Sequence, residues 1–168
     1  FKGQFIGFPR DFIAYGEFKT RLGRIISDVN MKVLKSPVYS GSIRAFDFNL
    51  GELLNDKNIG RTSASLTIKG AGFTKSTLKE ELNGTISYID FRGYRYRNAK
   101  VDGTFNKNLF DGKVRVDDAN LKLDFNGNVD LNPKLPQFNF IATVESANLR
   151  QLGFTKDTIK IDAKFTTN

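Results

Sequence analysis

The sequence has no cysteine, no histidine and no tryptophan, and among its 168 residues are one methionine and four prolines. Without cysteine there are no disulfides, and without cysteine or histidine the usual zinc sites and the Ser-His-Asp and Cys-His triads are excluded. No stretch approaches the ~18 uninterrupted apolar residues of a membrane-spanning helix. The absence of thiols is compatible with an oxidising compartment. We therefore expect no metal and no cofactor.

The carboxylates do not form a catalytic pair either. They occur side by side at Asp117-Asp118 and at Glu80-Glu81. Neighbouring residues point to opposite faces of a strand and diverge on a helix, so neither pair converges on a substrate. No glycine-rich phosphate loop follows a strand and opens a long helix. We therefore expect that the chain is not an enzyme.

The sequence is rich in phenylalanine, and apolar and polar residues alternate along much of it. Sixteen phenylalanines and 39 % hydrophobic residues suit a single folded domain. From Leu121 to Leu131 every second residue is apolar or glycine, with polar residues between them. Such alternation predicts a strand with one dry and one wet face, continuous through Gly127 rather than turning at Asn126-Gly127. Similar segments recur every 8–14 residues or so, which is typical of an antiparallel meander.

Three segments depart from this alternation. The spacing of Leu78 and Leu82, the acids between them and a terminal Asn-Gly predict a short helix over residues 74–83. Shorter helical corners are expected at residues 50–54 and 149–152. The fold class is therefore all-β: an elongated, strongly curved, mostly antiparallel sheet of roughly ten to twelve strands with one or two short helices.

The two corners also suggest a repeat. Asn49 and Leu50 match Asn148 and Leu149 at an offset of 99 residues, and a few apolar positions match at the same offset. We expect a repetitive architecture in which about residues 1–137 form one unit and residues 138–168 begin the next. Because strand patterns run to both ends, we expect a fragment of a longer protein whose edge strands tend to self-associate.

The net charge of +8 raises the question of nucleic acid. The segment 92–97 (RGYRYR) interleaves arginine and tyrosine, as stacking surfaces do. On a strand, however, alternation places Tyr94 and Tyr96 on one face and Arg95 and Arg97 on the other. The remaining basic residues are scattered along the chain, which indicates a solvated outer face. We therefore expect no nucleic-acid partner.

The apolar face of so large a sheet must be covered or left as a trough. A trough lined by aliphatic and aromatic side chains would suit acyl chains, since each CH₂ removed from water is worth roughly 0.8 kcal/mol. A filled core is the alternative, and the pattern leaves both open. The in-phase lining candidates are Ile25, Val29, Met31, Val33, Leu66, Ile68, Ile86, Val114, Val116, Leu121, Leu123, Phe125, Val129, Phe138, Phe140, Ala142 and Val144.

Several short motifs follow one another along the chain: FIGF at 5–8, DFIAYG at 11–16, TRLG at 20–23, FDFNLG at 46–51, KGAGF at 69–73, GYRY at 93–96, DDANL at 117–121 and ANL at 147–149. In their order, the chain resembles the Bacteroidetes-type TamB-like proteins of the AsmA/TamB superfamily. The similarity spans the chain from about residue 1 to residue 161.

This resemblance implies a segment of a periplasmic bridge-like protein that is anchored in the inner membrane of a Gram-negative bacterium. Its taco-like groove would carry phospholipid acyl chains between the inner and outer membranes and so support outer-membrane biogenesis. A partner implied by the resemblance is an outer-membrane assembly barrel protein, contacted through another region. The alternative function is a structural or docking scaffold for outer-membrane protein assembly, with a filled core and binding through sheet edges.

Overall fold

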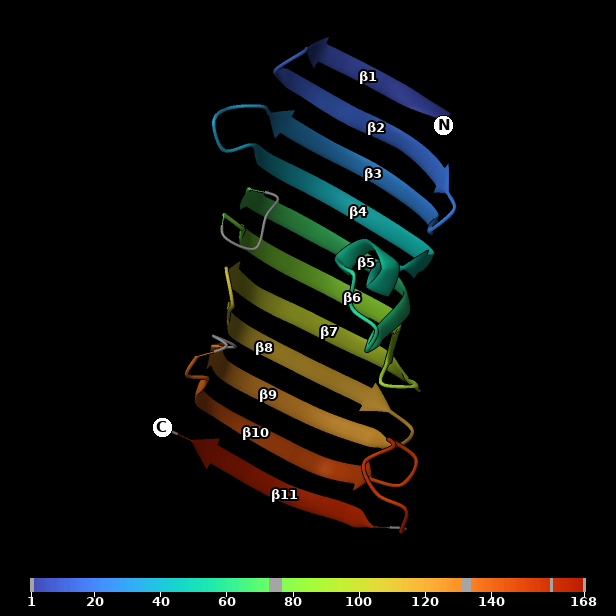
Figure 1. Cartoon of the computed structure of the whole chain (residues 1–168), viewed down its shortest axis with the longest axis vertical. Helices are drawn as coiled ribbons and strands as arrows, with labels where there is room; N and C mark the ends of the chain where they lie inside the picture. Colours follow the sequence, from blue (N-terminus) through green and yellow to red (C-terminus); the bar gives the residue numbers. More distant parts are fainter. Residues whose placement is uncertain (1, 73–76, 131–133, 158, 168) are drawn as a thin grey trace.

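The chain folds into a single antiparallel sheet of 11 strands whose spatial order follows the sequence. The computed structural model describes residues 2–72, 77–130, 134–157 and 159–167. The strands are β1 (Lys2–Phe8), β2 (Asp11–Thr20), β3 (Gly23–Lys32), β4 (Val38–Asn49), β5 (Ile59–Ala71), β6 (Lys79–Phe91), β7 (Tyr94–Asn106), β8 (Leu109–Asp118), β9 (Leu121–Asp130), β10 (Gln137–Asn148) and β11 (Lys160–Thr167). The predicted all-β fold class is confirmed, and β1 and β11 are the outermost strands, as expected (Figure 1).

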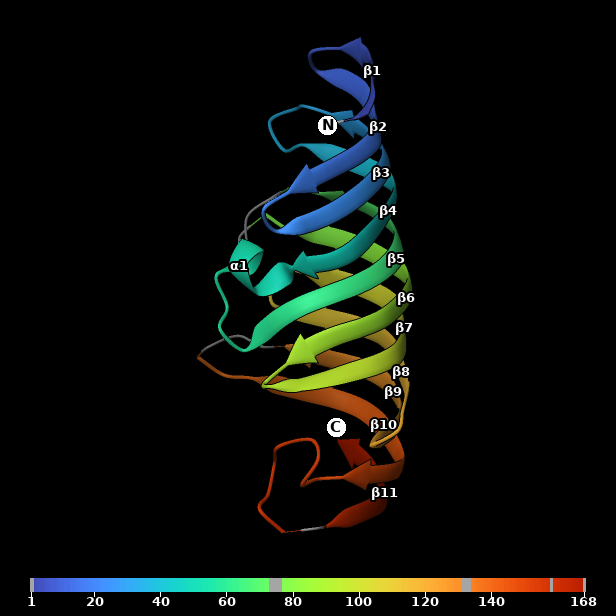
Figure 2. The ribbon, with the colours of Figure 1, turned by 90° about the vertical axis from the view of Figure 1, so that its right-hand side faces the viewer.

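The sheet is elongated and curved. Figure 2 shows it as a half-pipe whose connections lie on the open side together with α1 (Leu50–Leu54), the one helix among the described residues. The accessible surface is 11485 Å². A compact monomer of 18.9 kDa would expose about 8,300 Å². The excess exposure is that of a one-layer sheet, which lacks a second layer to cover it.

Glycines at the centre of the strands allow this curvature. Gly103, Gly112 and Gly127 are paired directly across β7, β8 and β9. Gly127 has φ +149°, and a Cβ placed on it would lie 2.4 Å from the Phe140 Cα and 2.3 Å from the Asn139 oxygen. A residue with a side chain would push β9 away from β10. Gly127 therefore bends a continuous strand, as predicted, instead of forming a turn.

The helix predicted over residues 74–83 is wrong where the structure describes it. Residues 79–83 begin β6, which pairs with β5 and with β7, and residues 74–76 lie outside the described part. A spacing of four fits a helix face and also a strand face, because four is an even number. Leu82 faces the same side as its partners Ile68 and Gly103. Pairing on both sides therefore outweighed the local helix signals.

The two predicted corners have different outcomes. Residues 50–54 form α1, capped by Asn49, whose side-chain oxygen accepts from the Glu52 amide at 3.2 Å. Residues 149–152 form a hydrogen-bonded turn rather than a helix. The Asn148 side chain nevertheless accepts from the Gln151 amide at 3.3 Å, in the same way as Asn49 does. The capping interaction is thus shared although the helix is not.

The hairpins that contain these corners have the same register. Each strand pair has a register shift just before its corner, in β4 between Ala45 and Phe48 and in β10 between Val144 and Ala147. The matched pairs are Ala45↔Ala64 with Val144↔Ala163, Phe48↔Thr62 with Ala147↔Ile161, and Asn49↔Arg61 with Asn148↔Lys160. Every member of the second set lies 99 positions after its counterpart. The division of the chain at residue 137 stays a prediction.

Candidate functional site

The strand register arranges one face of the sheet into rows that cross the strands. Directly paired residues of an antiparallel sheet point to the same side, so a chain of pairings defines a row. We call the four rows below the apolar face. They are Phe12–Met31–Tyr39–Gly70–Glu80–Phe105–Phe110–Val129–Phe138, Ala14–Val29–Gly41–Ile68–Leu82–Gly103–Gly112–Gly127–Phe140, Gly16–Ser27–Ile43–Leu66–Gly84–Val101–Val114–Phe125–Ala142 and Phe18–Ile25–Ala45–Ala64–Ile86–Ala99–Val116–Leu123–Val144.

Apart from Ser27, Glu80 and the hydroxyl of Tyr39, these rows consist of apolar residues and glycine. The opposite face differs sharply. Its central row reads Tyr15–Asp28–Ser42–Thr67–Asn83–Asp102–Lys113–Asn126–Ile141, so it is polar from β3 to β9 and ends in an exposed tyrosine and an exposed isoleucine. Water therefore wets one side of the sheet, while the other presents a continuous apolar surface that extends from β2 to β10.

The apolar face is the concave one. On a single-layer sheet a side chain can be buried by its neighbours on the same face, and bending toward that face crowds them. Val29, Ala99 and Val116, which belong to the apolar face, are 7–9 % exposed. No described side chain is less than 2 % exposed. Among the described residues the extensive strand contacts are all between neighbours in the sheet, and no second layer packs over this face.

Sixteen of the seventeen predicted lining residues lie on this side of the sheet. Fifteen are members of the four rows, and Leu121 is paired with Ala147 just beyond them. Val33 is the exception, because β3 ends at Lys32 and Val33 lies in the following connection, 38 % exposed. Its backbone amide donates to the Arg10 carbonyl at 2.8 Å. Whether these residues contact a ligand stays a prediction.

Other members of the apolar face were not among the candidates. The alternation that identified Val114 applies equally to Ala14, Ile43 and Val101, so the same signal could have found them. Leu82 was missed because its segment was predicted to be helical. Phe105 was missed because its strand, β7, was recognised from its first residues alone.

Aromatic rings cover the glycines of the sheet centre. The ring centroids of Phe105 and Phe110 are 4.9 Å apart, those of Phe110 and Phe125 are 6.2 Å apart, and those of Phe125 and Phe140 are 5.1 Å apart. A Cβ on Gly103 would meet the Phe110 ring at 2.9 Å. The rings thus occupy the space that the glycines leave, as in other sheets where an aromatic residue shields a paired glycine. Four rings from four consecutive strands form one hydrophobic ladder.

One polar pair interrupts the apolar face. The Tyr39 hydroxyl donates to the Glu80 carboxylate and also contacts the Gly72 carbonyl at 3.3 Å. Burial raises the pKa of the Glu80 carboxyl above its ordinary value of 4.5, although the hydrogen bond from Tyr39 opposes this. Burial and the neighbouring carboxylate raise the pKa of Tyr39 as well. This pair lies in the outer row nearest the β3–β4 and β7–β8 connections, and in the two middle rows Ser27 alone is polar.

A second polar cluster lies at the opposite end of the strands. Asp118, 3 % exposed, accepts from the backbone amides of Arg97 and Asn120, both at 2.9 Å, and from the Tyr94 hydroxyl. Among the described residues no buried side-chain nitrogen or oxygen lacks a hydrogen-bond partner. Hydrogen bonds from a hydroxyl and two backbone amides therefore stabilise the buried Asp118 carboxylate.

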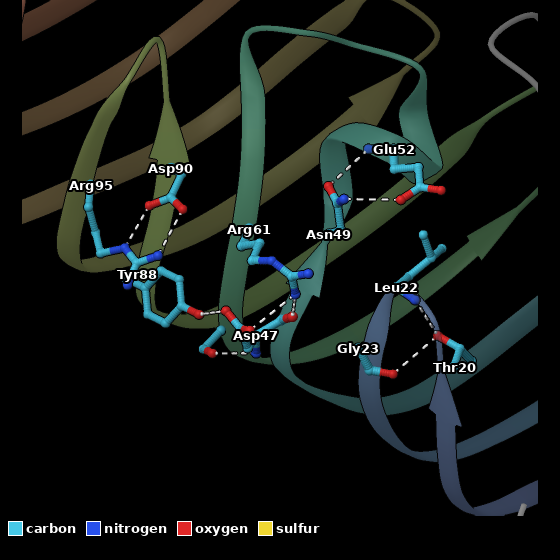
Figure 3. Close-up of polar contacts among 11 residues, drawn as sticks. Thr20, Leu22, Gly23, Asp47, Asn49, Glu52, Arg61, Tyr88, Asp90 and Arg95 are labelled. Carbon is cyan, nitrogen blue, oxygen red and sulfur yellow. Dashed lines mark hydrogen bonds and ion pairs between the residues drawn. The ribbon is translucent and has the colours of Figure 1, made fainter.

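The segment 92–97 has the arrangement that alternation predicted. Tyr94 and Tyr96 are half-buried on the concave side, whereas Arg95 and Arg97 are exposed. The Arg95 guanidinium forms two hydrogen bonds with Asp90, at 2.6 and 2.8 Å, and lies 4.0 Å from the Tyr88 ring centroid (Figure 3). Asp90 therefore neutralises the charge of Arg95 and occupies two of its five N–H donors.

The same edge of the sheet holds further paired charges. Asp47 accepts from Arg61 at 3.1 Å and from the Tyr88 hydroxyl at 2.5 Å, and α1 lies beside this network (Figure 3). Arg21 forms an ion pair with Glu52 of α1. Opposite charges therefore compensate one another along the edge formed by the β2–β3, β4–β5 and β6–β7 connections, which we call the corner rim.

No protein-family model matches this chain, and no curated protein or solved structure is significantly similar to it. In the described ranges, none of the helical structure is long and apolar enough to cross a membrane. Among the described residues, the aspartate and glutamate side chains do not form a group of three that could hold a metal ion.

Proposed function

We propose that the apolar face is a binding groove for acyl chains, within a segment of a periplasmic bridge-like protein that carries phospholipid between the inner and outer membranes. The observation that supports this most is the concave surface: four apolar rows run from β2 to β10, and among the described residues no second layer packs over them. Phe138 is 45 % exposed, and the other large apolar side chains of the rows are buried or half-buried by neighbours on the same face, so a ligand would cover the part of each that still meets water.

The shape of the surface favours a long, flexible apolar ligand. The rows run across the strands, so a chain lying along the half-pipe would meet the same environment at each strand. Strands are about 4.8 Å apart, which makes the distance from β2 to β10 about 38 Å. Each CH₂ group taken from water onto this face contributes roughly 0.8 kcal/mol. Ser27 is uncharged and donates to the Ala14 carbonyl, and the Glu80 carboxylate, which accepts from Tyr39, lies in the outer row nearest the β3–β4 and β7–β8 connections.

A photo-crosslinking experiment tests the proposal. A photoreactive residue at Leu123, on the apolar face, should give lipid adducts in cells that make phospholipid. The same residue at Asn126, which is exposed on the opposite face of β9, is the matched control and should give none. Phe140→Asp should remove the adducts at Leu123, because a carboxylate in an apolar groove costs several kcal/mol.

Circular dichroism must show that Phe140→Asp retains the strand content of the parent protein. If the variant unfolds, Ala142→Ser, which adds a hydroxyl group to the same strand, replaces it. Absence of adducts at every tested position of the apolar face would overturn the proposal. The face would then be an ordinary hydrophobic surface, and the scaffold for outer-membrane protein assembly would become the better explanation.

A further inference from the structure

The connections at the other ends of the strands differ from the corner rim in charge. Five connections lie there, on the left in Figure 1, and we call this edge the basic rim. Residues 73–76 of the β5–β6 connection lie outside the described part, so four connections are considered: β1–β2, β3–β4, β7–β8 and β9–β10. Each contains one basic residue and no acidic residue: Arg10, Lys35, Lys107 and Lys134. All four side chains are exposed. In the sequence these residues are scattered, but the meander brings them to one edge because every second connection lies on the same side.

Few of these charges are compensated. Within the described ranges, Arg10, Lys35 and Lys107 have no acidic side chain within ion-pair distance. The carboxylate of Asp11, which begins β2, is instead bound by Lys32 at 3.3 Å. Among the described residues, Arg10, Lys35 and Lys107 are therefore exposed cations without an acidic partner, in contrast to the paired charges of the corner rim.

Large apolar side chains project beside the cations. Phe8 is 80 % exposed next to Arg10, Leu34 is 61 % exposed next to Lys35, and Leu135 is 68 % exposed next to Lys134. Cations alternating with exposed phenylalanine and leucine are typical of surfaces that bind the interface of a lipid bilayer. The apolar side chains enter the interface, and the cations contact phosphates and anionic headgroups.

The rim is preorganised by its backbone. The Val33 amide donates to the Arg10 carbonyl at 2.8 Å, the Gly72 amide to the Pro37 carbonyl at 2.9 Å, and the Lys107 amide to the Leu78 carbonyl at 2.9 Å. Neighbouring hairpins are thus joined outside the strands themselves. With about 9.6 Å between hairpins, the first and last cations lie roughly 38 Å apart. The charges form an extended row rather than a compact site.

We propose that the basic rim docks onto an anionic phospholipid bilayer surface. Phe8, Leu34 and Leu135 insert into the interface, and Arg10, Lys35, Lys107 and Lys134 contact the anionic headgroups. This docking does not depend on what the apolar face binds, since the rim residues lie outside its four rows. The charge complementarity favours a bilayer over a second copy of this chain, which is itself basic.

Vesicle sedimentation tests the charge component. The chain should bind vesicles of phosphatidylcholine with phosphatidylglycerol and should bind pure phosphatidylcholine weakly. Replacing all four rim cations with glutamine should weaken binding to the anionic vesicles several-hundred-fold, about fivefold for each charge. The matched control replaces Arg44, Lys100, Lys113 and Lys160, which are exposed elsewhere, and should retain most of the binding. An equal loss in both variants would mean that net charge alone is responsible and would overturn the proposal.

Tryptophan fluorescence tests the insertion, because the chain has no tryptophan of its own. Leu34→Trp should shift to shorter wavelength on anionic vesicles and be quenched by brominated acyl chains. Leu54→Trp on α1, at the corner rim and 50 % exposed, should do neither. A shift at both positions, or at neither, would overturn docking by the basic rim. Binding of a DNA oligonucleotide with the same rim dependence but no shift at Leu34→Trp would favour nucleic acid instead.

Discussion

Gly127→Ala should strongly destabilise the sheet, because the position has neither the backbone conformation nor the space for a side chain. Its φ of +149° is one that residues with a Cβ rarely adopt, and holding such a residue there costs about 1–3 kcal/mol. The new methyl carbon would lie 2.3 Å from the Asn139 oxygen and 2.4 Å from the Phe140 Cα. Both contacts are with backbone, so a side-chain rotation cannot relieve them.

Relief requires that β9 and β10 move apart at this point. Losing one or two ladder hydrogen bonds adds roughly 1 kcal/mol for each. The total loss should be about 3 kcal/mol or more, a large part of the roughly 5–15 kcal/mol that stabilises a typical domain. Urea denaturation followed by far-ultraviolet circular dichroism measures this loss as a decrease in the free energy of unfolding.

The matched control is Gly93→Asn. Gly93 has φ +81° in the two-residue β6–β7 turn, and a Cβ placed on it would meet nothing within 4 Å. Asparagine tolerates a left-handed conformation, so the loss should be less than about 1 kcal/mol. If Gly127→Ala changed the free energy of unfolding by no more than Gly93→Asn does, close strand approach at Gly127 would not be what fixes the bend.

Three further predictions concern polar groups. Burial raises the pKa of Glu80 above its unfolded-state value of about 4.5. The wild-type protein should therefore lose stability as pH rises from about 4.5 through the higher folded-state pKa. Denaturation curves taken across that pH range should show that Glu80→Gln abolishes this loss. Asp118→Asn replaces one carboxylate oxygen by an amide NH₂ group, which cannot accept from the Tyr94 hydroxyl or from the backbone amides of Arg97 and Asn120. Thermal and urea denaturation should show that the free energy of unfolding falls by about 2–3 kcal/mol. Unchanged stability would contradict the role of the cluster. Asn49→Ala and Asn148→Ala should each cost about 1 kcal/mol, and the double variant should show their sum, because the two corners lie far apart. A loss at Asn49 alone would mean that the corners are not equivalent.

Much of the fold could be predicted because alternation acts locally. In a one-layer sheet, the face on which a side chain lies depends on whether its position along the strand is odd or even, which we call its parity. The sequence shows this parity directly at Leu121, Leu123 and Phe125. The same logic correctly placed Tyr94 and Arg95 on opposite faces. The four-residue spacing of Leu78 and Leu82 fits both a helix and a strand, and there the local helix signals led to the wrong structure.

The remaining features depend on relations between strands. The basic rim could not be seen in the sequence, because Arg10 and Lys107 become neighbours along one edge only once the number and order of the strands are known. Likewise, the Tyr39–Glu80 contact joins β4 to β6 across the intervening β5. Val33 was assigned to the lining because its parity is correct, but parity carries no information about where a strand ends.

The equal register of the two corner hairpins has a consequence for how such a sheet can change in length. The matched strands β4 and β10 are six strands apart, an even number, so the repeat preserves strand direction, the apolar side and the rim on which each connection lies. An insertion or deletion of one hairpin preserves all three as well and changes the length by about 9.6 Å. A single added strand would reverse every connection beyond it. The length of such a sheet can therefore change only in steps of one hairpin if the apolar side and the two rims are to be preserved.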